Sequence, residues 1–175
     1  DVQNTAPGSS QATKFRAHQA TNCPTAMMPL STDWAALHSK VDAMTPTGNT
    51  NVTIGMVWAW QTLSPVAPMN APEPALDLDK VIVLLTDGDN TEAWKNSNNS
   101  KVTSSSSINA RTKLACTNIK AANIKLYTIR VIDGNATLLK ECATNTSMYF
   151  DVKNSSQLSG VFSVIAQNLA NLRLA

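Results

Sequence analysis

The residue best placed to do chemistry is Asp87, which directly follows the strongest predicted strand of the chain. That strand covers residues 80–86, a continuous apolar run of the kind that parallel sheets cover on both faces. Open α/β sheets bind their ligands at the carboxyl ends of the strands, which is where Asp87 lies. A carboxylate beside Gly88 suits a hard cation such as Mg²⁺, because such ions take oxygen ligands. The sequence therefore predicts a ligand or metal site at this strand end.

The same segment fits three other interpretations in part. Asp89, with its neighbours 90 and 91, is of a type that caps turns and would then have no further role. The run from Asp87 to Thr91 also matches D-x-D-x-T and so resembles haloacid-dehalogenase-type phosphatases, in which the first Asp attacks phosphorus and the second protonates the leaving group. That chemistry needs a later acidic pair, but residues 131–134 offer Asp133 alone, and no phosphate-stabilising Lys is identifiable. We keep the phosphatase as an alternative.

A calcium-binding loop over residues 87–98 is the third interpretation. It fails at two positions, since Glu92 replaces the turn glycine and Asn98 replaces the bidentate Glu. We discard it.

Helices and strands are predicted to alternate around Asp87. Helices are expected over residues 31–44, 50–63, 108–122, 136–143 and 156–172, and strands over 80–86, 124–131 and 148–152. Such alternation indicates a doubly wound, mostly parallel α/β sheet with right-handed crossovers and helices on both faces. Residues 1–30 are expected to be irregular, residues 31–175 to form one domain, and the polar loop 96–107 to be mobile.

Apolar side chains recur at helical spacing in three of the predicted helices. The first helix, expected to be capped by Ser31 or Thr32, carries Trp34, Leu37, Val41 and Met44 on one face. In the second, apolar residues cover most of the circumference, which predicts burial on more than one side. The last carries Leu158, Val161, Phe162, Ile165, Leu169 and Leu172 on a face expected to pack on the sheet. The tryptophans are expected to be core or interface anchors, and an exposed Trp94 would lie near the mouth of the site.

Composition excludes several classes of protein. Charged residues make up 15% of the chain and its net charge of +2 is scattered, so no nucleic-acid patch is predicted. No run approaches the ~20 apolar residues of a membrane helix. The chain begins at Asp1 without a Met, and we expect it to be a fragment of a longer protein.

The three cysteines lack the spacing of a zinc site. Cys116 and Cys142 fall in predicted helices on either side of one strand, so a disulfide between them is expected in an oxidising compartment. Three buried thiols are the alternative. If the disulfide forms, the partner of Cys23 would lie upstream of this chain.

Two segments of the chain resemble metal-binding loops of the von Willebrand factor type A fold. Residues 81–88 are similar to its third loop and residues 48–51 to its second, which implies that Asp87 acts through water and that Thr50 ligates the ion. The first loop, D-x-S-x-S, is absent from the 175 residues. The resemblance thus implies the C-terminal portion of such a domain, with an incomplete site that binds Mg²⁺ in the millimolar range or not at all. The strand 80–86 would then present an exposed edge, open to homodimerisation.

A closer resemblance, covering most of the chain, is to the C-terminal region of TadG-like proteins of the tight-adherence (Flp) pilus system. Five segments carry it together: 29–34, 48–55, 81–91, 121–131 and 157–173. The family implies a non-enzymatic adhesion or assembly module, periplasmic or at the cell surface of the bacterial envelope, with a membrane anchor outside this chain. Protein partners are expected near Thr50 and Asp87, with contacts from Asn49, Asn51, Gly88, Asp89 and Trp94. A structural domain with a vestigial metal site is the alternative.

Overall fold

The computed structural model describes residues 24–67, 69–76, 78–94 and 101–171. The helices are α1 (Trp34–Asp42), α2 (Val52–Thr62), α3 (Ser105–Ala121), α4 (Ala136–Cys142) and α5 (Leu158–Asn171), with 3-10 turns η2 (Thr146–Met148) and η3 (Ser155–Gln157). The strands are β1 (Val81–Thr86), β2 (Ala93–Trp94), β3 (Lys101–Val102), β4 (Lys125–Val131) and β5 (Tyr149–Val152). No helix in these ranges is both long and apolar enough to cross a membrane. All predicted helices and longer strands are present.

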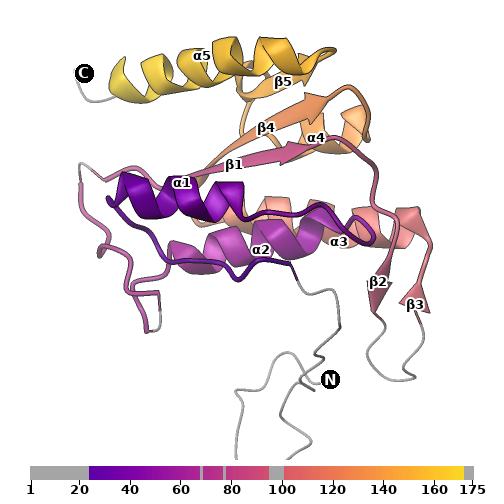
Figure 1. The fold of residues 1–175 in the computed structure, drawn as a ribbon, viewed down its shortest axis with the longest axis horizontal. Coiled ribbons are helices and arrows are strands. Elements are labelled where there is room, and N and C mark those ends of the chain that lie inside the picture. Colours follow the sequence, from indigo (N-terminus) through magenta and orange to yellow (C-terminus); the bar gives the residue numbers. More distant parts are fainter. Residues whose placement is uncertain (1–23, 68, 77, 95–100, 172–175) are drawn as a thin grey trace, which may run out of the picture.

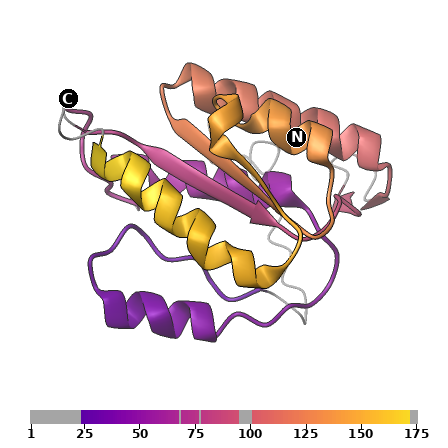
Figure 2. The ribbon, with the colours of Figure 1, turned by 90° about the horizontal axis from the view of Figure 1, so that it is seen from above.

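A three-stranded parallel sheet in the order β1-β4-β5 is the centre of the fold. Val81 lies opposite Lys125 in the β1–β4 pair, and Thr128 lies opposite Tyr149 in the β4–β5 pair. Helices α2 and α3 lie on one side of the sheet and α5 on the other (Figures 1 and 2). The predicted α/β architecture with helices on both faces is therefore confirmed.

Each face of the sheet has its own apolar core. One contains Ile82, Leu84 and Leu126 of the sheet with Met56, Ile119, Leu138 and Leu139 of helices α2, α3 and α4. The other contains Tyr127, Ile129, Val131 and Val152 with Ile165 of α5. Since β4 contributes to both cores, it is the strand with the most buried side chains.

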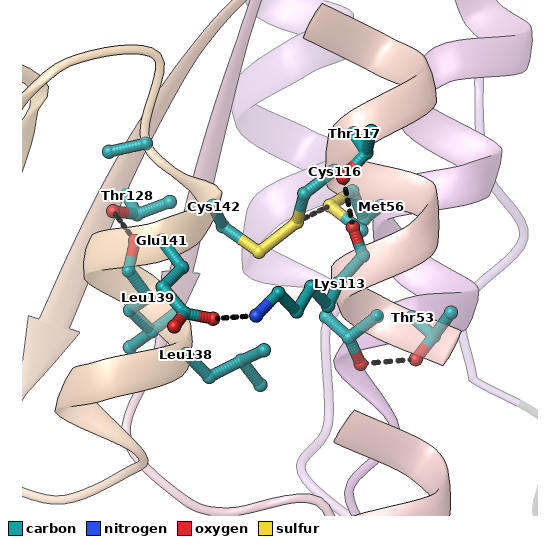
Figure 3. The surroundings of a disulfide bond; sticks show 12 residues. Thr53, Met56, Lys113, Cys116, Thr117, Thr128, Leu138, Leu139, Glu141 and Cys142 are labelled. Carbon is teal, nitrogen blue, oxygen red and sulfur yellow. Dashed lines mark hydrogen bonds and ion pairs between the residues drawn. A yellow bond between two sulfur atoms is a disulfide. The ribbon is translucent and has the colours of Figure 1, made fainter. Parts of the chain in front are cut away.

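The predicted disulfide between Cys116 and Cys142 is confirmed and lies inside the first core. It joins α3 to α4 with a Cα–Cα distance of 5.1 Å, and Cys116 Sγ lies 3.5 Å from Met56 Sδ of α2 (Figure 3). An ion pair between Lys113 and Glu141, 2.8 Å long, connects the same two helices. Cys23 lies outside the described residues.

Helices α1 and α2 are less buried than their sequences predict. Helix α1 begins at Trp34 with Asp33 as its cap, so neither Ser31 nor Thr32 has that role. It has no buried residue, and Trp34 is 72% exposed, because no other element packs closely against it in the described ranges. In α2 only Met56 is buried, while Trp58 is 50% exposed. Helix α2 packs on two elements, β1 and α3, so the prediction that it is buried on more than one side is confirmed only in part.

Strand β1 is covered on one face only. Ile82 and Leu84 are buried, whereas Val83 and Leu85 are 38% and 43% exposed. The prediction of two covered faces is therefore wrong, because α5 packs on β4 and β5 rather than over β1. Phe162 of α5 is likewise exposed, against expectation, and Leu172 is outside the described residues. Among the residues with assigned positions, β1 pairs with β4 alone, so the predicted free edge is present.

The polar loop after Asp89 is shorter than predicted. Strands β2 and β3 pair antiparallel, with Ala93 opposite Val102, and α3 already begins at Ser105. The expectation of a mobile loop is thus wrong for its C-terminal part, because a strand and the first helical turn form there. Residues 95–100 and the side chain of Trp94 lie outside the described part of the chain.

Candidate functional site

Two loops, residues 48–51 and 87–92, are joined by hydrogen bonds at the carboxyl end of β1. The Thr50 amide donates to Thr91 Oγ1 at 2.9 Å, and the Thr50 carbonyl accepts from the Thr91 amide at 2.9 Å. Asn49 Nδ2 donates to Glu92 Oε2 at 3.0 Å. The structure thus brings together the two segments that the sequence selected far apart in the chain, those of Thr50 and Asp87.

Asn90 fixes these loops to the body of the domain. Its side chain is 3% exposed; Oδ1 accepts from the Val52 amide at 2.9 Å, and Nδ2 donates to Asn109 Oδ1 at 2.7 Å and Thr112 Oγ1 at 3.2 Å. Thr112 is fully buried and bonds in turn to Thr53 Oγ1 at 2.6 Å. A buried polar network whose members are all paired makes a site rigid. The sequence suggested only a turn cap for Asn90, because nothing local marks its partners on α2 and α3.

Asn51 has two structural contacts. Its Oδ1 accepts from the Ile54 amide and so caps α2, while Nδ2 donates to the Glu92 carbonyl at 3.0 Å. The side-chain amides of both Asn49 and Asn51 therefore hold Glu92. A contact of these two residues with a partner stays a prediction.

A third loop, residues 132–135 after β4, meets the other two at Gly88. A Cβ atom added to Gly134 would lie 3.2 Å from the Gly88 carbonyl oxygen, and Gly134 has a φ of +105°. A Cβ on Gly88 would lie 3.9 Å from Thr50 Oγ1. Gly134 is therefore required both by its backbone conformation and by the close approach of the two loops. In the sequence this loop was of interest only for Asp133.

Charged side chains secure the third loop from β4 and β5. Arg130 Nε donates to the Gly134 carbonyl at 2.8 Å, and Arg130 Nη1 pairs with Asp151 Oδ1 at 3.0 Å. Lys153 Nζ lies 2.8 Å from the other carboxylate oxygen of Asp151. Hydrogen bonds from Lys153 and then Arg130 lower the pKa of Asp151, so the carboxylate that orients Arg130 keeps its charge to a lower pH than an ordinary aspartate does.

The oxygen donors around Gly88 form only part of a metal site. The Thr50 hydroxyl and the exposed Asp87 carboxylate come from adjoining loops, as the resemblance implies. Within the described ranges, however, no three His, Cys, Asp or Glu side chains are grouped to hold an ion. Mg²⁺ demands near-ideal octahedral coordination, and one hydroxyl with one carboxylate leaves most of its positions to water. The donors therefore do not fit a complete site.

A family model describes the chain over almost its whole length. Residues 2–164 match the von Willebrand factor type A domain. The chain belongs to this family. Its three parallel strands are consistent with a truncated type A fold, as the absence of the first metal loop from the sequence predicts. Comparison with curated protein sequences finds no match.

Solved structures show the same fold at low sequence identity. Proximal thread matrix protein 1 from the mussel byssus, with a zinc-occupied MIDAS motif, is 19% identical with a TM-score of 0.51, over 80% of this chain and 28% of that one. The pilus adhesin SpaC from Lactobacillus rhamnosus GG, in an open conformation, is 12% identical with a TM-score of 0.57, over 78% of this chain and 21% of that one. This chain thus spans less than a third of the length of each of these proteins.

Proposed function

We propose that this type A domain is a non-enzymatic protein-binding module for adhesion or assembly. Its binding surface is the set of three loops around Gly88, defined as residues 48–51, 87–92 and 132–135. The observation that carries the proposal is the Asn90 network, which fixes the first two of these loops to α2 and α3 while Asp87 and Asp89 remain exposed. A surface that is already ordered loses little conformational entropy on binding.

The finer proposal is that the domain is part of a TadG-like pilus-assembly protein in the periplasm or at the cell surface. The five sequence segments that resemble such proteins support it. So does the disulfide between Cys116 and Cys142, since such bonds form and persist in oxidising compartments. The partner is then a pilus or envelope component, and a membrane anchor would belong to a part of the protein outside this chain.

Binding to such a partner is testable with purified tight-adherence pilin and envelope components on a biolayer sensor. We expect Asp87→Asn and Asp89→Asn together to weaken binding about tenfold, as removal of central contacts commonly does. Asp42→Asn is the matched control, because Asp42 is an exposed aspartate on α1. Unchanged affinity in the double variant would contradict the proposed surface, and absence of binding to all these components would contradict the pilus assignment.

Mg²⁺ is expected to bind in the millimolar range or not at all, because the donors supplied by Thr50 and Asp87 are few. Isothermal titration of the chain with MgCl₂ measures this directly. A micromolar affinity lost in Asp87→Asn would contradict the prediction and show that the loops complete the site by other means. If neither Mg²⁺ nor protein binding depends on Asp87, the alternative of a structural domain with a vestigial site is favoured.

The phosphatase alternative loses its support with family membership, since type A domains are in general adhesion modules without enzymatic activity. It would require Asp87 as nucleophile. We expect hydrolysis of p-nitrophenyl phosphate with Mg²⁺ to be no faster for the wild type than for Asp87→Asn. A rate that depends on Asp87 would revive the enzyme hypothesis.

A further inference from the structure

Ile132, directly after β4, has a backbone conformation that its side chain disfavours. Its φ is 62°, and the Asp133 amide donates to the Val131 carbonyl at 2.6 Å, which closes a γ-turn around Ile132. Such positive-φ turns are rare and strained, and a β-branched residue there is an outlier. The other non-glycine residues with positive φ in the described ranges are Asn70 and Asn123, of a type that tolerates it.

The strained turn is held in place from both sides. The Ile132 amide donates to the Val152 carbonyl of β5 at 2.6 Å, and the Gly134 amide donates to Asp133 Oδ1 at 2.8 Å. Arg130 fixes the Gly134 carbonyl, as described above. Strained residues persist where their surroundings determine them in this way, and they are concentrated at functional sites.

Burial of the side chain does not explain the choice of isoleucine. Ile132 is 59% exposed, although Val131 and Ile129 just before it are 6% and 0% exposed. Glycine or asparagine would adopt this turn with less strain and would expose less apolar surface. A position that breaks a local rule without a compensating gain in the fold is expected at a functional site. The loop that carries Ile132 touches Gly88 through Gly134, so Ile132 belongs to the surface proposed above.

We propose that Ile132 is the apolar contact residue of this surface and receives an apolar side chain of a protein partner. The inference rests on the proposed function and deepens it by naming the partner's chemistry at one point. The turn fixes the backbone of Ile132 before binding, so ordering it again costs little. Asp87 and Asp89, both exposed, lie on the loop of Gly88, which the loop of Ile132 meets at Gly134.

Selection from a phage-displayed random peptide library against the wild-type chain tests the proposal without a known partner. Enriched peptides are expected to carry an apolar residue and to bind Ile132→Asn at least about tenfold more weakly. Ile132→Val is expected to restore most of the affinity. Leu114→Asn is the matched control, because Leu114 of α3 is 61% exposed, and it should bind like the wild type.

Thermal unfolding supplies a second readout, because substitution of Ile132 would lower the unfolding temperature if the residue had a structural role. Because the turn is strained by isoleucine, Ile132→Asn and Ile132→Gly should unfold at the same temperature as the wild type or above it. A marked fall in both would overturn the proposal by showing that Ile132 is a packing residue. Peptides sensitive to Asp87→Asn but not to Ile132→Asn would overturn it and leave the proposed function standing. Peptides sensitive to neither, or no enriched peptides, would contradict both.

Discussion

Helices α3 and α1 are both predicted from the sequence, yet the structure buries them to different extents. Helix α3 buries five residues and is joined to α4 by a disulfide. It lies near the part of the sheet where β1 is paired with β4. Helix α1 buries none, and β1, which lies at the edge of the sheet, exposes Val83 and Leu85. Apolar periodicity therefore identifies the face of a helix that is suited to burial. Whether that face is buried depends on whether another element of the fold packs against it.

Among the changes that test this difference between α3 and α1, removing the disulfide should have the largest effect on the free energy of unfolding. Replacing Cys116 and Cys142 together by alanine opens a loop with a sequence separation of 26 residues, which costs about 3.5 kcal/mol by the chain-entropy estimate. Urea unfolding of the variant, and of the wild type with and without reductant, measures the loss. A loss below about 1 kcal/mol would mean that packing of α3 on α4 is sufficient without the covalent link.

Asn90→Ala should have the next largest effect. It leaves the Val52 amide, Asn109 and Thr112 without a common partner, which we expect to cost about 2–3 kcal/mol. Asn118→Ala, at an exposed position of α3, is the matched control and should change stability little. Urea midpoints give the comparison; equal midpoints for the two variants would show that the network does not fix the loops.

The Asn90 network also shows which features of the fold and the site the sequence alone is not able to predict. Strands β1 and β4 and the asparagine cap of α2 have local signals, namely apolar runs and a polar residue before a helix. The network has none, since Val52, Asn109 and Thr112 come from two helices distant in the chain. The strained turn at Ile132 was missed for another reason: a β-branched residue at the end of a strand gives no sign of positive φ.

The free edge of β1 leads to a prediction of intermediate size. Its sequence contains none of the charges or prolines that protect edge strands, so we expect a concentration-dependent homodimer through it. Val83→Lys should weaken the dimer about tenfold, equivalent to 1.4 kcal/mol. Light scattering over a range of concentrations measures both chains, with Leu114→Lys as a control on α3. A wild type that stays monomeric at high concentration would rule out this use of the edge.

Trp34→Ala should have the smallest effect, although tryptophan is the largest side chain. Because Trp34 is 72% exposed on α1, its removal should change the free energy of unfolding by less than about 0.5 kcal/mol. Urea unfolding at low protein concentration tests this, with Met56→Ala at the buried position of α2 as the contrasting change, expected to cost about 2–5 kcal/mol. A large effect of Trp34→Ala that appears only at high concentration would place α1 in the dimer interface. A large effect at every concentration would mean that α1 packs within the monomer. That result would contradict the difference in burial between α1 and α3.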